Sequence, residues 1–236
     1  MNYVVIPTYQ ERDNIEAAVT AVVGLSPEFR VVVVDDDSTD GTKEKLADLA
    51  QRFTDQLHVI HRPAPRSFAG SYIDGFQHAL SQSDCSSVIE CDADGSHPFD
   101  RIPDLVRSLD SAEVAVGSRY VTGGNINGFS KDRLLLSSAA NLYLRVATGL
   151  PARDITAGFV AYRAPTLRRL PYQGIRSNGY AFQIEMKWLA QNAGASLVEL
   201  PITFVDRSKG HSKMSLHTMV EAFCIGGQYC LKRIIS

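Results

Sequence analysis

Short apolar runs alternate with amphipathic segments along the N-terminal part of the chain. Apolar positions recur at helical spacing over residues 15–23, 46–53 and 69–80, which predicts three helices with one buried face each. Between them lie apolar runs that predict buried strands at Tyr3–Ile6, Val31–Val34, Leu57–Ile60 and Ser87–Cys91. This alternation predicts an α/β fold with a mainly parallel central sheet and helices on both faces.

The pattern loosens in the second half of the chain. Val114–Gly117 predicts a further strand, and the glycines and asparagines of residues 123–128 predict a loop. Residues 134–147 are apolar almost all round, so we expect a helix that is either buried or packed on an apolar partner. A later helix is expected over residues 182–193, followed by an edge strand at Leu197–Ile202, because Pro201 cannot donate to a sheet ladder.

Polar groups follow three of the predicted strands. They are Pro7-Thr8-Tyr9, Asp35-Asp36-Asp37 and Asp92-Ala93-Asp94. Ligands of parallel sheets bind outside the carboxyl ends of the strands, where these groups lie. We therefore expect the three groups to line one crevice.

Composition narrows the function classes. The 44% hydrophobic and 21% charged residues are typical of a globular protein, and a net charge of −2 gives no indication of nucleic-acid binding. Residues 1–100 carry 17 acidic and 7 basic side chains, a net of −10, whereas residues 101–236 carry 9 and 17, a net of +8. This asymmetry is either a chance of surface composition or a cation-binding half joined to an anion-binding half.

Targeting and redox signals favour a cytoplasmic protein. The four cysteines (Cys85, Cys91, Cys224 and Cys230) have no zinc-type spacing, which indicates a reducing compartment. No signal peptide is expected at the N-terminus, and no apolar run reaches the length of about 18 residues that a membrane-spanning helix needs.

The aspartate pair Asp92 and Asp94 is the strongest candidate for chemistry. Two carboxylates at i and i+2 after a buried strand can share one cation, and an open oxygen site suits Mg²⁺ or Mn²⁺ that also coordinates a diphosphate. The alternative is an aspartate pair that only stabilises a turn. The acids at 35–37 are interpreted as nucleoside contacts or as helix caps, the latter through Asp37, Ser38 or Asp40. Neither a Gly-rich dinucleotide turn nor a P-loop is present, which argues against a nicotinamide enzyme.

Seven blocks follow one another in a distinctive order and spacing. They are residues 7–15, 34–42, 92–98 (Asp-Ala-Asp-Gly-Ser-His-Pro), 117–120, 154–159, 177–180 and 207–213. Together they resemble inverting family-2 glycosyltransferases of GT-A fold, most of all the polyprenyl-phosphate (dolichyl-phosphate) mannose synthase group, and the resemblance runs from about residue 3 to residue 215.

The resemblance implies a metal-dependent hexosyltransferase, with mannose from GDP-mannose and a polyprenyl phosphate as the expected donor and acceptor. It implies nucleotide contacts from Pro7, Tyr9, Glu11, Asp36 and Asp92, and metal contacts from Asp92, Asp94 and Ser96. Acceptor or phosphate contacts are expected from Arg119, Arg133, Ser137, Arg207 and Lys213. The expected catalytic residues are Asp94, Arg119 and Asp154. Ser96 stands where the family usually has Gln, and Ser67-Phe68-Ala69-Gly70-Ser71 stands in place of its Gly-Leu-Gly block.

The acceptor decides whether a general base is needed. A phosphate monoester is largely ionised at neutral pH, so cationic side chains must position it rather than deprotonate it. A hydroxyl acceptor would need a base, for which Asp154 is the candidate; the alternative is a structural Asp154 beside Arg153. A related transferase with a soluble acceptor or another nucleotide-sugar donor, and a non-catalytic nucleotide-sugar binding module, remain rival hypotheses.

The chain is divided into a GT-A domain over residues 1–215 and an amphipathic helical tail over residues 216–236. The tail mixes apolar residues with Lys232 and Arg233. With the helix at 134–147 it would rest on a membrane surface beside a lipid phosphate, which makes the protein peripheral at the cytoplasmic face of the membrane. The alternatives are packing on the core or on a second subunit of an oligomer.

Overall fold

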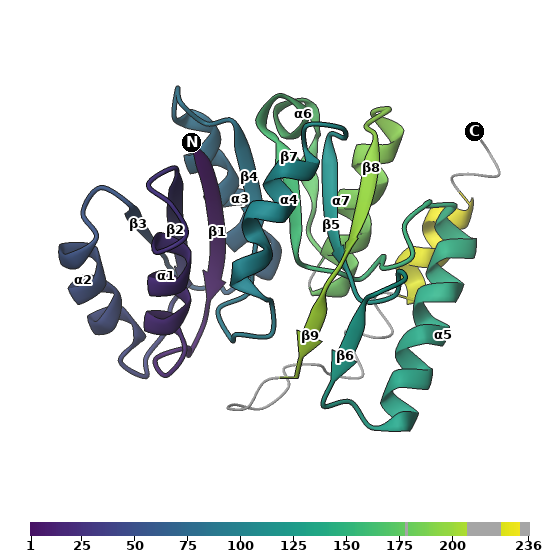
Figure 1. The fold of residues 1–236 in the computed structure, drawn as a ribbon, viewed down its shortest axis with the longest axis horizontal. Helices are drawn as coiled ribbons and strands as arrows, with labels where there is room; N and C mark the ends of the chain where they lie inside the picture. The colour runs from purple at the N-terminus through teal and green to yellow at the C-terminus, as the bar shows by residue number, and fades with distance from the viewer. Residues whose placement is uncertain (178, 207–222, 232–236) are drawn as a thin grey trace.

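A seven-stranded sheet forms the centre of the computed structural model, which describes residues 1–177, 179–206 and 223–231 (Figure 1). The strand order is β3-β2-β1-β4-β7-β5-β8. The strands are β1 (Asn2–Thr8), β2 (Phe29–Asp36), β3 (Leu57–Arg62), β4 (Ser87–Glu90), β5 (Val114–Ser118), β7 (Val160–Arg163) and β8 (Leu197–Pro201).

The expected mainly parallel sheet is confirmed, with one reversal in its middle. β1 pairs in parallel with β2 on one side and β4 on the other, and β5 pairs in parallel with β8 at the edge. β7 lies between β4 and β5 and is antiparallel to both. The sequence analysis did not predict β7, although three of its four residues (Val160, Ala161 and Tyr162) are apolar.

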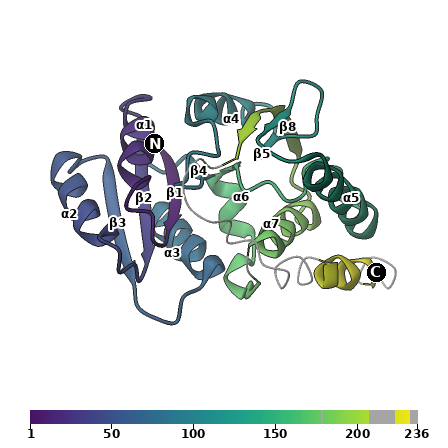
Figure 2. The same cartoon turned by 90° about the horizontal axis from the view of Figure 1, so that it is seen from below.

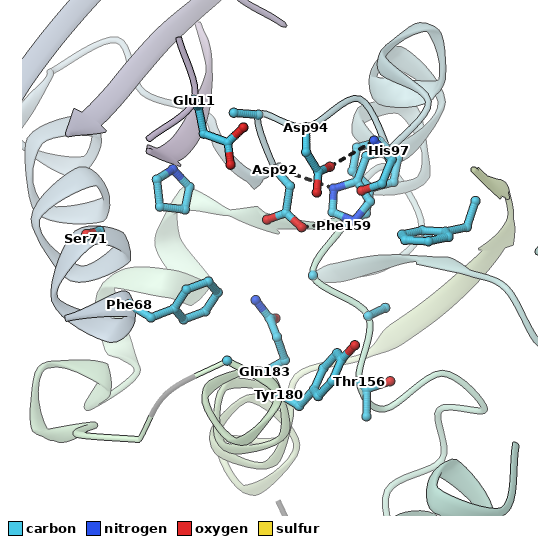
Figure 3. A pocket seen from close by; sticks show the side chains of 18 of the residues that line it. Glu11, Phe68, Ser71, Asp92, Asp94, His97, Thr156, Phe159, Tyr180 and Gln183 are labelled. Carbon is cyan, nitrogen blue, oxygen red and sulfur yellow. Dashed lines mark hydrogen bonds and ion pairs between the residues drawn. The ribbon is translucent and has the colours of Figure 1, made fainter. Parts of the chain in front are cut away.

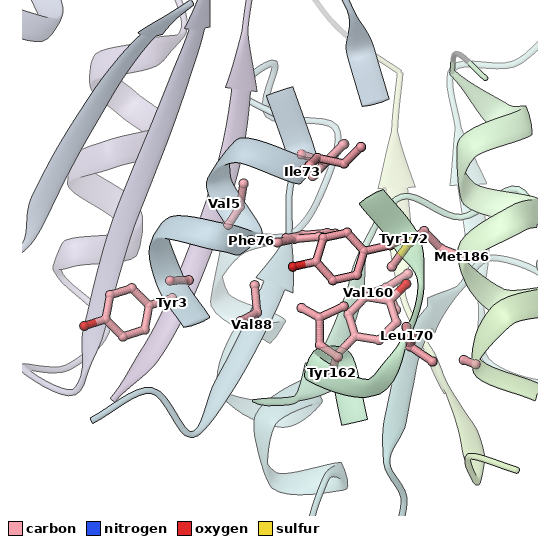
Figure 4. Close-up of a cluster of buried hydrophobic side chains, with 14 of the residues drawn as sticks. Tyr3, Val5, Ile73, Phe76, Val88, Val160, Tyr162, Leu170, Tyr172 and Met186 are labelled. Atoms are coloured by element: carbon pink, nitrogen blue, oxygen red, sulfur yellow. The ribbon is translucent and has the colours of Figure 1, made fainter. Parts of the chain in front are cut away.

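Two helical layers cover the sheet (Figures 1 and 2). Alternate residues of β1 point to opposite faces, so Val4 and Ile6 pack with α1, α2 and α4, whereas Tyr3 and Val5 pack with α3, α6 and α7. Figure 4 shows the second of these clusters, in which Phe76 and Tyr162 are fully buried. The helices are α1 (Ile15–Val23), α2 (Thr42–Arg52), α3 (Phe68–Ser81), α4 (Ile102–Ser108), α5 (Lys131–Thr148), α6 (Ala164–Arg169) and α7 (Tyr180–Asn192), with short 3-10 turns at Phe99–Arg101 and Tyr172–Gly174.

A second, two-stranded sheet lies below the edge of the first. β6 (Asn125–Asn127) pairs in parallel with β9 (Thr203–Val205), so the expectation of an irregular loop over 123–128 is wrong for its central residues. Gly124 allows the chain to turn here, because a Cβ at this position would lie 2.7 Å from the carbonyl oxygen of Arg119. The small sheet carries the chain from β5 to the start of α5.

α5 stands apart from the main layers and exposes an apolar face. Leu135, Leu142 and Val146 are 72%, 62% and 69% exposed, so the helix is not buried within the described residues, and packing on an apolar partner stays the open alternative. Residues 223–231 are helical and pack beside α5 and α7, with Phe223 stacked on Tyr143 at 4.5 Å between ring centroids. Within the described ranges, no helix has the length and apolar character needed to cross a membrane.

Candidate functional site

A cavity of about 440 Å³ opens at the carboxyl ends of β1, β2 and β4 (Figure 3). The three polar groups that follow these strands contribute to its wall, as the strand-end argument predicts. α7 and the segment between α5 and β7 close the opposite side. The polar, charged and aromatic side chains that line the cavity include Tyr9, Glu11, Asp36, Arg66, Phe68, Asp92, Asp94, Ser96, His97, Arg119, Arg133, Tyr180 and Gln183.

The loop after β1 is braced against the loop after β2. Gln10 adopts a positive φ of 56°, and its backbone N–H donates to Ser38 Oγ at 2.9 Å. The N–H of Glu11 donates to Thr42 Oγ1 at 3.1 Å. Pro7, Tyr9 and Glu11 all face the cavity, and the Arg66 guanidinium lies 4.1 Å from the centre of the Tyr9 ring. Arg66 was not assigned a role from the sequence, since a single Arg in a Pro-rich loop carries no distinctive pattern.

Asp36 faces the cavity, but both of its carboxylate oxygens accept hydrogen bonds from the protein. Arg62 Nη1 donates to Oδ1 at 2.6 Å, and the Ser67 backbone N–H donates to Oδ2 at 2.7 Å. Arg62 is also paired with Asp74 at 2.7 Å. Asp36 therefore ties the end of β2 to the start of α3, and its expected contact with a nucleoside stays a prediction.

The segment that replaces the family's Gly-Leu-Gly block begins α3 and shapes the cavity wall. Ser67 caps the helix, because its Oγ accepts from the Gly70 N–H at 3.0 Å. Phe68 projects into the cavity and packs edge-on against Phe182, 5.9 Å away. An aromatic ring thus lines the side of the cavity next to α3.

Asp92 and Asp94 are held in place by their own turn. The Ser96 backbone N–H donates to Asp94 Oδ1 at 3.0 Å, and the Asp92 N–H donates to His97 Nδ1 at 3.1 Å. His97 Nε2 lies 3.9 Å from Asp92 Oδ2, and its ring stacks on Phe159 at 5.0 Å. His97 is 5% exposed. His97 belongs to the block at residues 92–98 but had no predicted role. In the structure it supports Asp92.

The donor atoms at this turn fit an open cation site. In the described part of the chain there is no cluster of three or more His, Cys, Asp or Glu side chains that could enclose a metal by itself. Two carboxylates with a hydroxyl from Ser96 are instead the kind of partial oxygen set that Mg²⁺ or Mn²⁺ completes with substrate phosphates and water. Asp92, Asp94 and Ser96 could hold such an ion together with a diphosphate.

Arg119 and Asp154 form a buried bidentate ion pair. Asp154 Oδ2 accepts from Arg119 Nε at 2.7 Å and from its backbone N–H at 2.9 Å, and Oδ1 accepts from Nη2 at 2.6 Å. Burial opposes the charge of Arg119, but the attraction of Asp154 outweighs it and raises the pKa of the guanidinium above its ordinary value. Asp154 is fully buried and is not part of the cavity wall. This geometry favours the structural alternative, in which Asp154 orients Arg119, over a general base.

Arg133 and Ser137 extend the cavity along α5. Arg133 Nη1 lies 2.5 Å from Asp206 Oδ2, with its guanidinium 3.6 Å from the centre of the Phe129 ring. Ser137 Oγ accepts from the Tyr120 hydroxyl at 2.7 Å. The other two expected phosphate contacts, Arg207 and Lys213, lie outside the described residues.

A second, mostly apolar recess of about 390 Å³ adjoins the cavity at Arg133. Phe129, Thr156 and Tyr180 are shared between the two walls. The recess runs between α5 and the helix at 223–231. Its apolar lining comes from Leu136, Ala139, Ala140, Tyr143, Leu144 and Phe223. The charged end of the cavity at Arg133 is therefore continuous with the apolar recess.

Buried polar side chains lie beneath the cavity floor, which the sequence did not suggest. Burial raises the pKa of Glu90, and burial lowers the pKa of Lys187 although the two opposite charges attract. Lys187 Nζ donates to the carbonyl of Ala157 at 2.6 Å, which fixes the loop that forms the floor. Glu90 and Lys187 each lie among apolar residues in the sequence, and such a pattern predicts only core positions.

Comparison with known proteins agrees with this geometry. Residues 3–170 match the family described as Glycosyl transferase family 2. A polyprenol monophosphomannose synthase from Mycolicibacterium smegmatis is 42% identical over 93% of this chain and 83% of its own length. An undecaprenyl-phosphate mannosyltransferase from Micrococcus luteus is 40% identical over 89% of this chain and 86% of its own length.

Solved structures share the fold at much lower identity. Glucosyl-3-phosphoglycerate synthase from Mycobacterium tuberculosis, in complex with Mn²⁺, UDP-glucose and phosphoglyceric acid, superposes with a TM-score of 0.66 at 18% identity. The match covers 98% of this chain and 79% of that chain. The same enzyme with Mg²⁺ and UDP gives a TM-score of 0.67. The chain thus has the GT-A fold, whose neighbours here carry Mn²⁺ or Mg²⁺.

The assignment of Asp154 as an anchor predicts a stability effect. Asp154→Asn keeps the side-chain shape but leaves the buried Arg119 charge unpaired, so we expect the free energy of unfolding to fall by about 3 to 5 kcal/mol. Urea denaturation followed by circular dichroism measures this. The control is Asp206→Asn at the partly exposed Arg133 pair, where we expect a change below about 1 kcal/mol. An unchanged free energy in Asp154→Asn, with a loss of turnover alone, would contradict the anchor assignment.

Proposed function

Since the chain belongs to glycosyl transferase family 2, we propose that it is an inverting mannosyltransferase that moves mannose from GDP-mannose onto a polyprenyl phosphate. One observation carries the proposal. The two aspartates after β4 and the arginines Arg119 and Arg133 face one cavity, which opens into an apolar recess. The aspartates suit a cation-bound diphosphate leaving group, the arginines suit an anionic nucleophile, and the recess suits a lipid chain.

The donor is bound by the loops after β1, β2 and β4. Tyr9 and Arg66 form a flat wall suited to a nucleobase, and Pro7, Glu11 and Asp36 complete the nucleoside side of the cavity. Asp92, Asp94 and Ser96 would hold a divalent cation beside the diphosphate. When bound, this cation offsets the negative charge that develops on the departing nucleoside diphosphate.

The acceptor phosphate is bound at the opposite end of the cavity. Arg119 and Arg133 supply positive charge, and Ser137 supplies a hydroxyl. An ionised phosphate oxygen attacks without a general base, so the protein needs to position the nucleophile in line with the leaving group. Asp154 keeps the Arg119 guanidinium in one orientation, and Arg207 and Lys213 remain further expected contacts.

The apolar recess distinguishes a lipid acceptor from the soluble acceptor that was the rival hypothesis. A soluble phosphate would leave the recess beside Arg133 in contact with water, whereas the first isoprene units of a polyprenyl phosphate would fill it. The exposed apolar residues Leu135, Leu142 and Val146 lie on α5, the helix that also lines the recess. This face rests on the membrane that contains the lipid, as a peripheral contact.

Removing one carboxylate of the cation site tests the reaction. In Asp94→Asn we expect transfer of labelled mannose from GDP-mannose to a short polyprenyl phosphate, with Mg²⁺ or Mn²⁺, to fall at least about 100-fold, because charge on the leaving group is no longer offset. Asp100→Asn, an exposed aspartate of the turn after β4, serves as the matched control and should retain full activity. Wild-type protein that binds the donor but transfers no mannose would favour a binding module; efficient transfer only to a water-soluble acceptor would favour the rival transferase.

A substitution at Arg133 separates the two substrates. Arg133→Ala should raise the KM for polyprenyl phosphate by roughly 10- to 100-fold, since a charged hydrogen bond to the phosphate is lost. The Kd for GDP, measured by calorimetry with Mn²⁺, should stay unchanged. Arg145→Ala removes the same charge from an exposed position of α5 and should alter neither value. Equal losses of donor and acceptor binding in Arg133→Ala would reject the assignment.

The membrane contact predicts weaker vesicle binding when the apolar face of α5 becomes polar. The double variant Leu135→Ser, Leu142→Ser should bind phospholipid vesicles at least 10-fold more weakly in a co-sedimentation assay, because each leucine contributes about 1.5 to 3 kcal/mol when it leaves water. Ala47→Ser, on the exposed face of α2, is the control. Vesicle binding that is equal in all three proteins would refute the contact.

A further inference from the structure

One buried amide faces the cavity with no hydrogen-bond partner in the described part of the chain. Gln183 lies in the first turns of α7 and is 2% exposed, and neither its Nε2 nor its Oε1 has a partner within hydrogen-bond distance. Buried amides in folded proteins are nearly always paired, and leaving both atoms unpaired is unfavourable. A ligand that enters the cavity would supply the missing partners.

An ionisable neighbour of the Gln183 side chain is Glu90, whose two carboxylate oxygens also have no hydrogen-bond partner among the described residues. Burial raises the pKa of Glu90, and the nearby Gln183 side chain only partly offsets this rise; neither amide atom forms a hydrogen bond with the carboxylate. Lys187 Nζ donates to the backbone carbonyl of Gln183 at 3.3 Å and does not contact the side-chain amide. Gly158 keeps space open beside the amide, because a Cβ there would lie 3.4 Å from Nε2.

The amide projects from α7 into the space between Phe68 and Asp92 (Figure 3). The proposed diphosphate site lies at Asp92 and Asp94, and the proposed acceptor phosphate site lies at Arg119 and Arg133. The anomeric carbon must sit between these two sites, because it is bonded to the leaving oxygen and attacked by the acceptor oxygen. The hexose ring therefore lies over the floor from which Gln183 projects.

We propose that the Gln183 amide hydrogen-bonds a hydroxyl of the donor hexose and determines which sugar the enzyme accepts. This inference rests on the function proposed above. A hydroxyl both donates and accepts, which matches an amide that presents an N–H and a carbonyl oxygen side by side. The amide is also uncharged, so it does not repel the diphosphate as a third carboxylate would. A site that is built to hydrogen-bond a hydroxyl discriminates strongly against a sugar without it, since its own buried groups are then unpaired.

The test pairs Gln183→Met, which keeps the length of the side chain and removes the amide, with GDP-mannose and its 2-, 3-, 4- and 6-deoxy analogues. In the wild-type enzyme, kcat/KM should fall roughly 100-fold for the deoxy analogue that lacks the contacted hydroxyl. In Gln183→Met, kcat/KM for GDP-mannose should fall by a similar factor, and the same deoxy analogue should cause little further loss. The Kd for GDP should be unchanged. Gln191→Met, at an exposed position of α7, is the control and should behave as the wild type.

Two results would overturn the inference while the wild-type enzyme remains active. Equal sensitivity of Gln183→Met and wild type to every deoxy position would show that the amide does not contact the sugar. A large fall in melting temperature together with lost GDP binding would show a structural role instead. Wild-type enzyme that transfers no mannose from unmodified GDP-mannose would reject the proposed function, and the inference with it.

Discussion

The pairing of β4 with strands on both of its sides is the constraint on which the site depends. β4 is parallel to β1, so its carboxyl end lies beside those of β1 and β2. It is antiparallel to β7, and the segment that leads into β7 therefore reaches the same edge of the sheet. Asp92 and Asp94 follow β4 directly. One short strand thus places the aspartates between the nucleoside loops and the segment that carries Asp154 and Gly158.

Charged side chains of both signs line the cavity. The loops after β2 and β4 contribute carboxylates, and the segments after β5 and in α5 contribute Arg119 and Arg133. Arg66 from the first half of the chain and Asp206 from the second half also line it, so the net charges of residues 1–100 and 101–236 do not divide the cavity into two walls. In the proposed reaction, a negative diphosphate and a negative acceptor would each need positive charge, from a bound cation on one side and from arginine on the other.

The sequence predicted the sheet and its strand-end loops because both depend on local patterns. Valine-rich runs such as Val31–Val34 indicate buried strands, and the carboxyl ends of parallel strands meet without further information. β7 and the β6–β9 pair were missed: β6 and β9 have only three residues each, and the pairing of all three strands depends on segments that lie far apart along the chain. The roles of Arg62, Gln183 and Lys187 likewise depend on contacts between distant segments. Asp36 was recognised by its place after β2, but its pairing with Arg62 and Ser67 could only come from the structure.

Asp92 and Asp94 are proposed to hold a divalent cation beside the diphosphate of the donor. A crystal structure of the protein with GDP and Mn²⁺, with data collected at the manganese absorption edge, would show whether they do. We expect an anomalous peak bounded by these two carboxylates and the diphosphate, with the base beside Tyr9. GDP bound with no peak at that position, or a peak coordinated by other side chains, would contradict it.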